Sequence, residues 1–248
     1  MVDGRYIYCI IDWEEKRPIG NFGNIGIGEN TVYTIYYKDI AAVVSTIPFK
    51  QMESNLNDIV AHQRVVEAAR EANTVLPVRF GVILKNEAGI KKLLASSYKD
   101  YHAKLTSLRG KDEIGIKVLL NKSSLKKIRE QAEQSSEEIR KIKQEISSAK
   151  PGTSYFLKLR LEDAVKNETL MKIDKMVGEI NDSLAEVAVD KRLLKNDVAE
   201  IVLNAAYLVE RNKIQIFDAK VKELRERFEK EGIMTLHRSG PWAPYSFC

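Results

Sequence analysis

The sequence predicts an α+β protein of two domains. Runs of β-branched and aromatic residues that suit strands open each half of the chain, and amphipathic stretches with helical spacing follow them. A short polar break, Gly110-Lys111-Asp112, separates the two sets. This organisation predicts an N-terminal α+β domain at residues 1–110 and a C-terminal domain at residues 111–248.

The composition bounds the class of protein. Of the 248 residues, 44% are hydrophobic and 30% are charged, which is typical of a globular chain. No apolar run approaches the ~18–20 residues of a membrane span. Residues 1–5 lack the basic start and apolar stretch of a signal peptide, and Cys9 and Cys248 are too few for a disulfide scaffold. We therefore expect a cytoplasmic protein with two free thiols and no membrane contact.

The first domain is expected to begin with strands and continue with helices. Asn55 and Asn86 stand directly before helical patterns and are the expected N-caps. Lys38-Asp39 is a short polar break that predicts a hairpin. The expected elements are strands at 5–11, 32–37, 40–47 and 75–83, a Pro- and Gly-rich loop at 18–30, and helices at 55–73 and 86–109.

Arg79 is a cation within the otherwise apolar run at residues 75–83. An arginine at the end of a strand pairs with a carboxylate or extends its head into solvent, and this interpretation is favoured. The alternative is that Arg79 recognises a carboxylate or the main chain of a partner, because a guanidinium presents a fork of donors.

The second domain is expected to carry a long helical arm at about residues 122–187. Pro151-Gly152 interrupts two apolar seams whose members alternate three and four residues apart. The pattern predicts either an antiparallel helical pair or a kinked helix with a projecting arm, and it does not choose between them. The seams comprise Leu125, Ile128, Ala132, Ser135, Ile139, Ile142, Ile146 and Ala149, and then Leu170, Ile173, Val177, Ile180, Leu184 and Val187.

Strands and one further helix surround this arm in the sequence. Strands are predicted at 113–120, 188–193, 199–210 and 233–238, and a helix at 213–231 that Gly232 caps. The window 199–210 fits strand and helix alike, and the polar Arg211-Asn212 that ends it favours a strand. The resulting β-α-β-β-α-β order is that of a modified ferredoxin-like fold with a long helical insertion.

The chain ends in an aromatic strap, residues 240–248, that is too apolar to be left loose in water. Its prolines disfavour a helix and limit ladder hydrogen bonds, so an extended segment docked in a groove is expected. We expect the strap to cover the sheet of the second domain, and binding of a partner is compatible with that. The candidate site residues are Arg79 and, in the strap, Gly240, Pro241, Trp242, Pro244, Tyr245 and Phe247.

Motifs of catalysis and metal binding are not found in the sequence. His62, His102 and His237 lie far apart, neither cysteine has a neighbouring cysteine, and no nucleophile elbow or Walker loop occurs. The net charge is +5, but cations alternate with carboxylates along the chain, which favours a solvated surface over a nucleic-acid interface. We expect no enzyme activity, no metal and no cofactor.

Several stretches together resemble the gas vesicle protein F/L family. The family's terminal Gly-Pro-Trp-Pro-Pro-Tyr-Ser-Phe is matched at residues 240–247, except that Ala243 replaces a proline. Residues 76–81 (Leu-Pro-Val-Arg-Phe-Gly), 203–209 (Leu-Asn-Ala-Ala-Tyr-Leu-Val) and the Pro151-Gly152 break before Tyr-Phe-Leu are similar as well.

The resemblance implies a non-enzymatic accessory or minor structural protein that is needed to assemble gas vesicles. It implies two α+β domains and binding to the small, hydrophobic major shell protein and to other gas vesicle accessory proteins. We hypothesise that an open sheet edge and an apolar groove hold the shell subunit. The alternative is a ferredoxin-like module that binds a small molecule or has a regulatory role.

Overall fold

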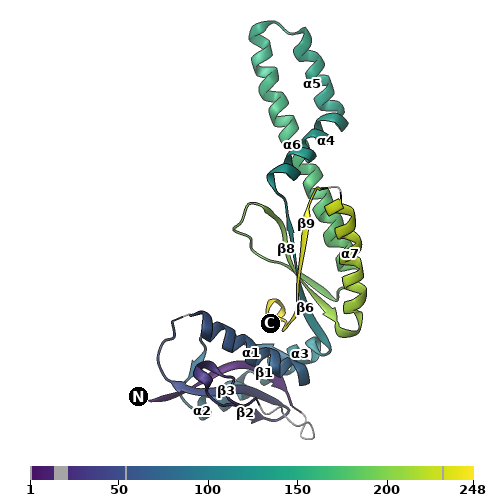
Figure 1. Ribbon diagram of the computed structural model, residues 1–248. Coiled ribbons are helices and arrows are strands. Elements are labelled where there is room, and N and C mark those ends of the chain that lie inside the picture. Colours follow the sequence, from purple (N-terminus) through teal and green to yellow (C-terminus); the bar gives the residue numbers. More distant parts are fainter. Residues whose placement is uncertain (1, 14–21, 54, 231) are drawn as a thin grey trace. The chain divides into compact units, whose positions relative to one another are not determined.

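The computed structural model describes residues 2–13, 22–53, 55–230 and 232–248. The chain forms two compact units (Figure 1). Unit 1 comprises the residues up to Glu113 together with Gly240–Cys248, and unit 2 comprises Ile114–Ser239. This grouping differs from the boundary expected at residue 110, and it moves the strap from the second part of the chain to the first.

Unit 1 is built on an antiparallel sheet whose strand order is β2-β3-β1-β4, with β5 also paired to β1. The central strand β1 is almost entirely buried because both of its faces are covered, and its run of Tyr, Ile and Cys residues suits that position. The strands are β1 (Asp3–Asp12), β2 (Val32–Tyr37), β3 (Ile40–Pro48), β4 (Val75–Pro77) and β5 (Ile83–Leu84).

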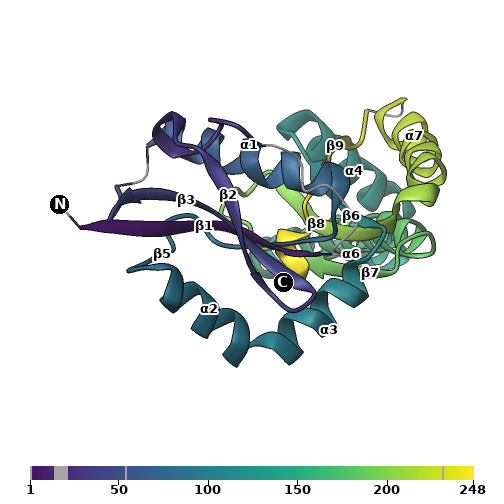
Figure 2. The ribbon, with the colours of Figure 1, turned by 90° about the horizontal axis from the view of Figure 1, so that it is seen from below.

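Helices lie on both faces of this sheet, with α1 (Leu56–Ala72) on one face and α2 (Glu87–Ser96) and α3 (Tyr98–Leu108) on the other (Figure 2). The two expected caps are present, because the Oδ1 atoms of Asn55 and Asn86 each accept a backbone N–H at 2.9 Å. The single helix expected at 86–109 is wrong, since the structure has two helices that meet at Ser97.

The strand expected at 75–83 is also wrong in its extent. β4 ends at Pro77 and β5 begins at Ile83, and the residues between them form a turn. Gly81 has a φ of 91°, a left-handed conformation that interrupts a strand and that glycine adopts readily. Arg79 therefore lies in a turn and not in a strand.

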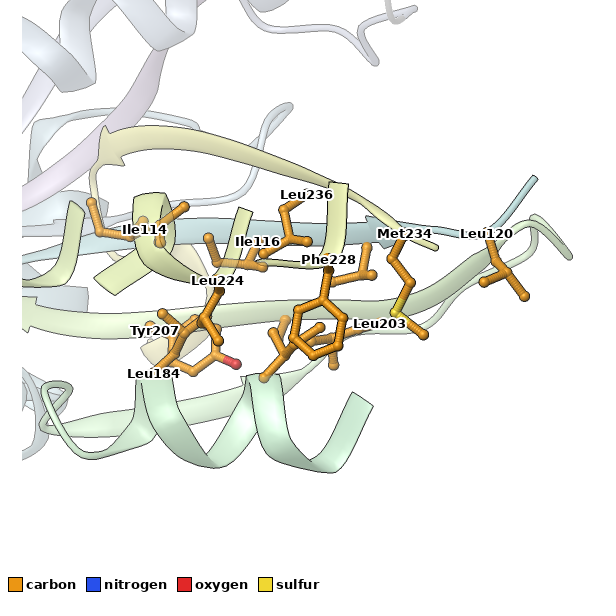
Figure 3. Close-up of a cluster of buried hydrophobic side chains, with 14 of the residues drawn as sticks. Ile114, Ile116, Leu120, Leu184, Leu203, Tyr207, Leu224, Phe228, Met234 and Leu236 are labelled. Atoms are coloured by element: carbon orange, nitrogen blue, oxygen red, sulfur yellow. The ribbon is translucent and has the colours of Figure 1, made fainter. Parts of the chain in front are cut away.

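Unit 2 has a four-stranded sheet of order β7-β8-β6-β9. Helix α7 (Ile214–Lys230) and the last turns of α6 (Pro151–Ala185) contribute to its core, where Tyr207, Leu224 and Phe228 meet (Figure 3). The strands are β6 (Lys111–Leu119), β7 (Asp190–Leu193), β8 (Ile201–Glu210) and β9 (Thr235–Trp242). The ambiguous window at 199–210 is thus a strand, as expected.

The arm of unit 2 is a helical hairpin, which decides between the two alternatives. α4 (Lys122–Ser135) and α5 (Glu137–Ser148) run along α6, which starts at Pro151 (Figure 1). Ion pairs Lys143–Glu133 at 3.0 Å and Arg160–Glu145 at 3.5 Å lie on its surface. Its buried seam includes Ile128, Ala132, Ile139, Ile142 and Val165.

Some sequence expectations fall on residues that are not described. Pro18 and Gly20 of the expected loop at 18–30, and Glu231 at the end of the helix expected at 213–231, lie outside the described residues. The described remainder of that loop contains the short 3-10 helix η1 (Ile27–Glu29).

Candidate functional site

The strap packs within unit 1, so the expectation that it covers the sheet of the second domain is wrong. β9 continues through Trp242, and the chain then forms a 3-10 turn, η3 (Tyr245–Phe247). Ala243 is fully buried, and both Ala243 and Tyr245 join the hydrophobic cluster of β1 and α1. The strap therefore packs on unit 1 through Ala243 and Tyr245, because the hydrophobic cluster that receives them is formed by β1 and α1.

Two carboxylates bind the main chain of the strap. Glu113 Oε2 accepts the backbone N–H of Ser246 at 2.8 Å, and Glu113 Oε1 accepts the Ser246 hydroxyl at 2.8 Å. Glu67 Oε1 accepts the backbone N–H of Ala243 at 3.2 Å. These bonds satisfy the backbone N–H groups of Ala243 and Ser246, which lie beyond the end of β9 and have no strand partner there.

Of these two carboxylates, only Glu67 belongs to a charged network, which joins α1 to Asp112 of β6 through Arg70. Arg70 Nε donates to Glu67 Oε2 at 2.7 Å, and one terminal nitrogen of Arg70 lies 2.9 Å from Asp112 Oδ2. Arg70 therefore neutralises Asp112, which is only 2% exposed. Glu113 has no ion pair in the described parts of the chain, and its burial raises the pKa of its carboxyl above the usual value.

The aromatic side chains of the strap differ in exposure. Tyr245 packs against the core, and burial raises the pKa of its phenol. Phe247 is half-buried, whereas Trp242 is 42% exposed. Pro244 is buried, and Gly240 and Pro241 are half-buried at the end of β9. Trp242 is accordingly the strap side chain best placed to meet another molecule.

Arg79 is exposed on a turn that buried side chains hold in place. Tyr6 Oη accepts the N–H of Gly81 at 3.1 Å and lies 2.8 Å from His62 Nδ1, and the N–H of Val78 donates to the Tyr8 carbonyl at 3.0 Å. Within the described residues Arg79 makes no hydrogen bond or ion pair. The structure therefore does not join Arg79 to the strap, although both belong to unit 1.

Two titratable side chains of the core are poorly suited to catalysis. Burial raises the pKa of the fully buried Cys9 thiol, so the reactive thiolate is disfavoured. Burial also lowers the pKa of His62 to about 4, which keeps the imidazole neutral at pH 7. Both residues lie among apolar side chains and serve the packing of unit 1.

Sequence reasoning missed an apolar surface on the arm. Leu125 and Leu170, the first members of the two seams, are 44% and 49% exposed. Both leucines line each of two adjoining hollows. One hollow has a volume of about 520 Å³ and includes Val165, and the other has a volume of about 430 Å³ and includes Ile173. The signal available in the sequence was positional, because each leucine is the first member of its seam.

A second exposed group of apolar residues lies near the tip of the arm. Tyr155 and Phe156 are 64% and 71% exposed, and their ring centroids are 5.8 Å apart in an edge-to-face arrangement. Leu159, one turn further along α6, is 44% exposed. Exposed apolar residues gathered in this way are characteristic of interaction surfaces.

Two searches of the described residues concern membrane-spanning helices and metal ligands. Among these residues, every helix is too short or too polar to cross a membrane. The search of the same residues also finds no group of three His, Cys, Asp or Glu side chains arranged to hold a metal ion.

Known proteins resemble this chain over nearly its whole length. The gas vesicle protein F of Haloferax mediterranei is 26% identical, over 100% of this chain and 94% of that protein. The gas vesicle protein L of a Streptomyces species is 25% identical, over 98% and 92%. The crystal structure of GvpF from Anabaena sp. PCC7120 matches the fold with a TM-score of 0.83 at 19% identity, over 99% and 98% of the two chains.

The family model described as gas vesicle synthesis protein GvpL/GvpF matches residues 4–248. That range includes the strap, the turn that carries Arg79 and the whole arm. The chain belongs to the GvpL/GvpF family of gas vesicle proteins.

Proposed function

We propose that the chain is a non-enzymatic assembly component of gas vesicles that binds the major shell protein. Membership of the GvpL/GvpF family supports a role in gas vesicle formation and association with other gas vesicle proteins. The shell protein is small and very hydrophobic, so a protein that handles it before assembly has to cover apolar surface. We propose that this accessory component is located at the gas vesicle while the vesicle is being assembled.

The apolar surface of the arm is the observation that carries this proposal. Leu125 and Leu170 line two hollows, one between α4 and α6 and one that continues from there to residues 199–202, and together these hollows make a groove. A groove of this kind suits the apolar face of an amphipathic helix. Charged residues of both signs, including Arg129, Glu162 and Asp174, stand around the groove and keep the arm soluble.

Two further features fit the same function. We propose that unit 2 is a modified ferredoxin-like domain, which its strand order β7-β8-β6-β9 supports. The edge strand β7 offers main-chain groups to a strand of the shell subunit.

We also propose that Arg79 and Trp242, which are both exposed, contribute to binding of gas vesicle partners.

The test of shell-protein binding is an affinity capture after co-expression with the major shell protein. The Leu125→Lys/Leu170→Lys variant places two charges in the groove, and we expect it to lose most of the captured shell protein. The control is Leu56→Lys, which changes an equally apolar residue that is 75% exposed on α1. Normal capture by the double variant, with its far-ultraviolet spectrum unchanged, would contradict binding through this groove.

A further inference from the structure

A small hollow lies beside the strap in unit 1. It has a volume of about 310 Å³ and is lined by Gln63, Glu113, Trp242, Ala243 and Tyr245. All five residues belong to unit 1. This volume lies at the lower end of the range of about 300–1,000 Å³ for ligand pockets, so it suits a single side chain.

Glu113 is a buried carboxylate without a counter-ion in the described parts of the chain. It is 9% exposed, and its polar contacts are the N–H and hydroxyl of Ser246, both neutral donors. The neighbouring Asp112 is even more deeply buried, at 2% exposed, but it pairs with Arg70 at 2.9 Å. Because a buried charge is costly when no opposite charge compensates it, the contrast marks Glu113 as a group that has hydrogen-bond donors but no cation beside it in the described residues.

Trp242 supplies the second half of the site. Its side chain lines the same hollow and is 42% exposed, whereas the other residues of the strap except Cys248 are buried or half-buried. The face of an indole ring attracts cations more strongly than any other aromatic side chain. A carboxylate and an exposed indole in one hollow are complementary to a positive charge carried on an apolar stem.

We propose that this hollow receives an arginine side chain of a partner protein. The guanidinium donates to the free lone pairs of the Glu113 carboxylate and stacks on Trp242, as its planar shape allows. Burial raises the pKa of Glu113 in the absence of that partner, and a bound cation would favour its ionised form. The proposal concerns unit 1 and does not depend on the groove of the arm.

The test uses the full chain and two peptides that differ in one charge. One is acetyl-Leu-Arg-Leu-amide, and the other replaces arginine with citrulline, which has nearly the same shape without the charge. Trp13→Phe leaves Trp242 as the only fluorophore of its kind, since the chain has two tryptophans. We expect the arginine peptide to change the Trp242 fluorescence and to bind at least about tenfold more tightly than the citrulline peptide.

Variants then assign the preference to the proposed residues. Glu113→Gln is expected to abolish the roughly tenfold preference, whereas Glu87→Gln, an exposed residue of α2, should leave it unchanged. Trp242→Ala, measured by calorimetry, is expected to weaken the arginine peptide by roughly two- to fivefold. Because the Trp242 side chain is exposed, Trp242→Ala should fold, so it still tests the proposal if Glu113→Gln unfolds. The proposal would be overturned if the two peptides bind with equal affinity or if neither binds. It would also be overturned if Glu113→Gln keeps the preference for arginine and Trp242→Ala binds the arginine peptide as tightly as the wild type.

Discussion

The strap and the tip of the arm are two aromatic segments next to prolines, and the chain treats them in opposite ways. The strap buries Tyr245 against the core of unit 1, whereas the arm exposes Tyr155 and Phe156. The backbone explains the difference. A helix satisfies its own N–H groups, so its aromatic side chains are free to point into solvent, but an irregular segment needs acceptors from its surroundings. Glu67 and Glu113 supply those acceptors to the strap.

The comparison predicts different energetic roles for two tyrosines of the same chain. We expect Tyr245→Ala to destabilise unit 1 by about 3 kcal/mol, because it leaves a cavity against β1 and α1. Tyr155→Ala should change the free energy of unfolding by less than about 0.5 kcal/mol, since its side chain is mostly in solvent. Urea unfolding measures both effects. It is followed by tryptophan fluorescence for Tyr245→Ala, because Trp13 and Trp242 both lie in unit 1, and by the helical circular dichroism signal for Tyr155→Ala, which changes the arm of unit 2. Equal losses in the two variants would break the comparison.

Acid is expected to weaken unit 1 before the arm, through His62. Its pKa is lowered to about 4 in the folded state from 6.5 in the unfolded state, so the unfolded chain binds more protons between these values. Stability is therefore full above pH 6.5 and falls as the pH drops towards 4, by at most about 3 kcal/mol. Tryptophan fluorescence reports unit 1 in this range, and far-ultraviolet circular dichroism is dominated by the helices.

The His62 contribution is isolated by comparing variants. The raised pKa of Glu113 acts in the opposite direction, because protonation of that carboxyl on acidification favours the folded state. The difference in slope between wild type and His62→Leu therefore measures His62 alone. An unchanged slope in His62→Leu would refute this assignment.

Removing one hydrogen bond from the strap should have an intermediate effect. Ser246→Ala deletes the hydroxyl that donates to Glu113, and we expect a loss of about 1.5 kcal/mol, the value of a bond to a charged group. The backbone N–H of Ser246 remains in place, so the strap should stay docked. The midpoint of urea unfolding, followed by tryptophan fluorescence, measures the change. A loss as large as that of Tyr245→Ala would mean that the hydroxyl positions the whole strap.

The smallest effect is expected on the surface of the arm. Lys143→Ala removes the ion pair with Glu133, whose partners are 48% and 32% exposed, and should cost less than about 1 kcal/mol. The loss should shrink further at high salt, because exposed charges are screened. The Ser246→Ala loss should depend less on salt. Thermal melts at low and high salt, followed by the helical circular dichroism signal, distinguish the two kinds of contact.

Elements that depend on neighbouring residues were predictable from the sequence. Strands β1, β2 and β3, the caps Asn55 and Asn86, and the strand at Ile201–Glu210 all follow from local pattern and local hydrogen bonds. The error around Arg79 was local as well. Gly81 needed to be interpreted as a break with a positive φ, and the apolar residues around it concealed that signal.

The location of the strap could not be predicted because its contacts are remote in sequence. Ser246 binds a carboxylate 133 residues away, and Ala243 binds one 176 residues away. Composition shows that the strap needs a cover, but it does not identify which of two apolar surfaces provides it. The exposed leucines of the arm were missed for a related reason, since a seam predicts an apolar face and not what covers that face.

The return of the last nine residues to unit 1 has a consequence for biosynthesis. Residues 114–239 are made after most of unit 1, and at roughly 5–20 residues per second the ribosome needs about ten seconds to reach the strap. During that interval the surface that receives Tyr245 stays uncovered and the Glu113 carboxylate lacks Ser246. Completion of the first-made unit therefore waits until residues 240–248 have been made, so a chain that stops before them remains recognisable to chaperones and proteases as an unfinished product.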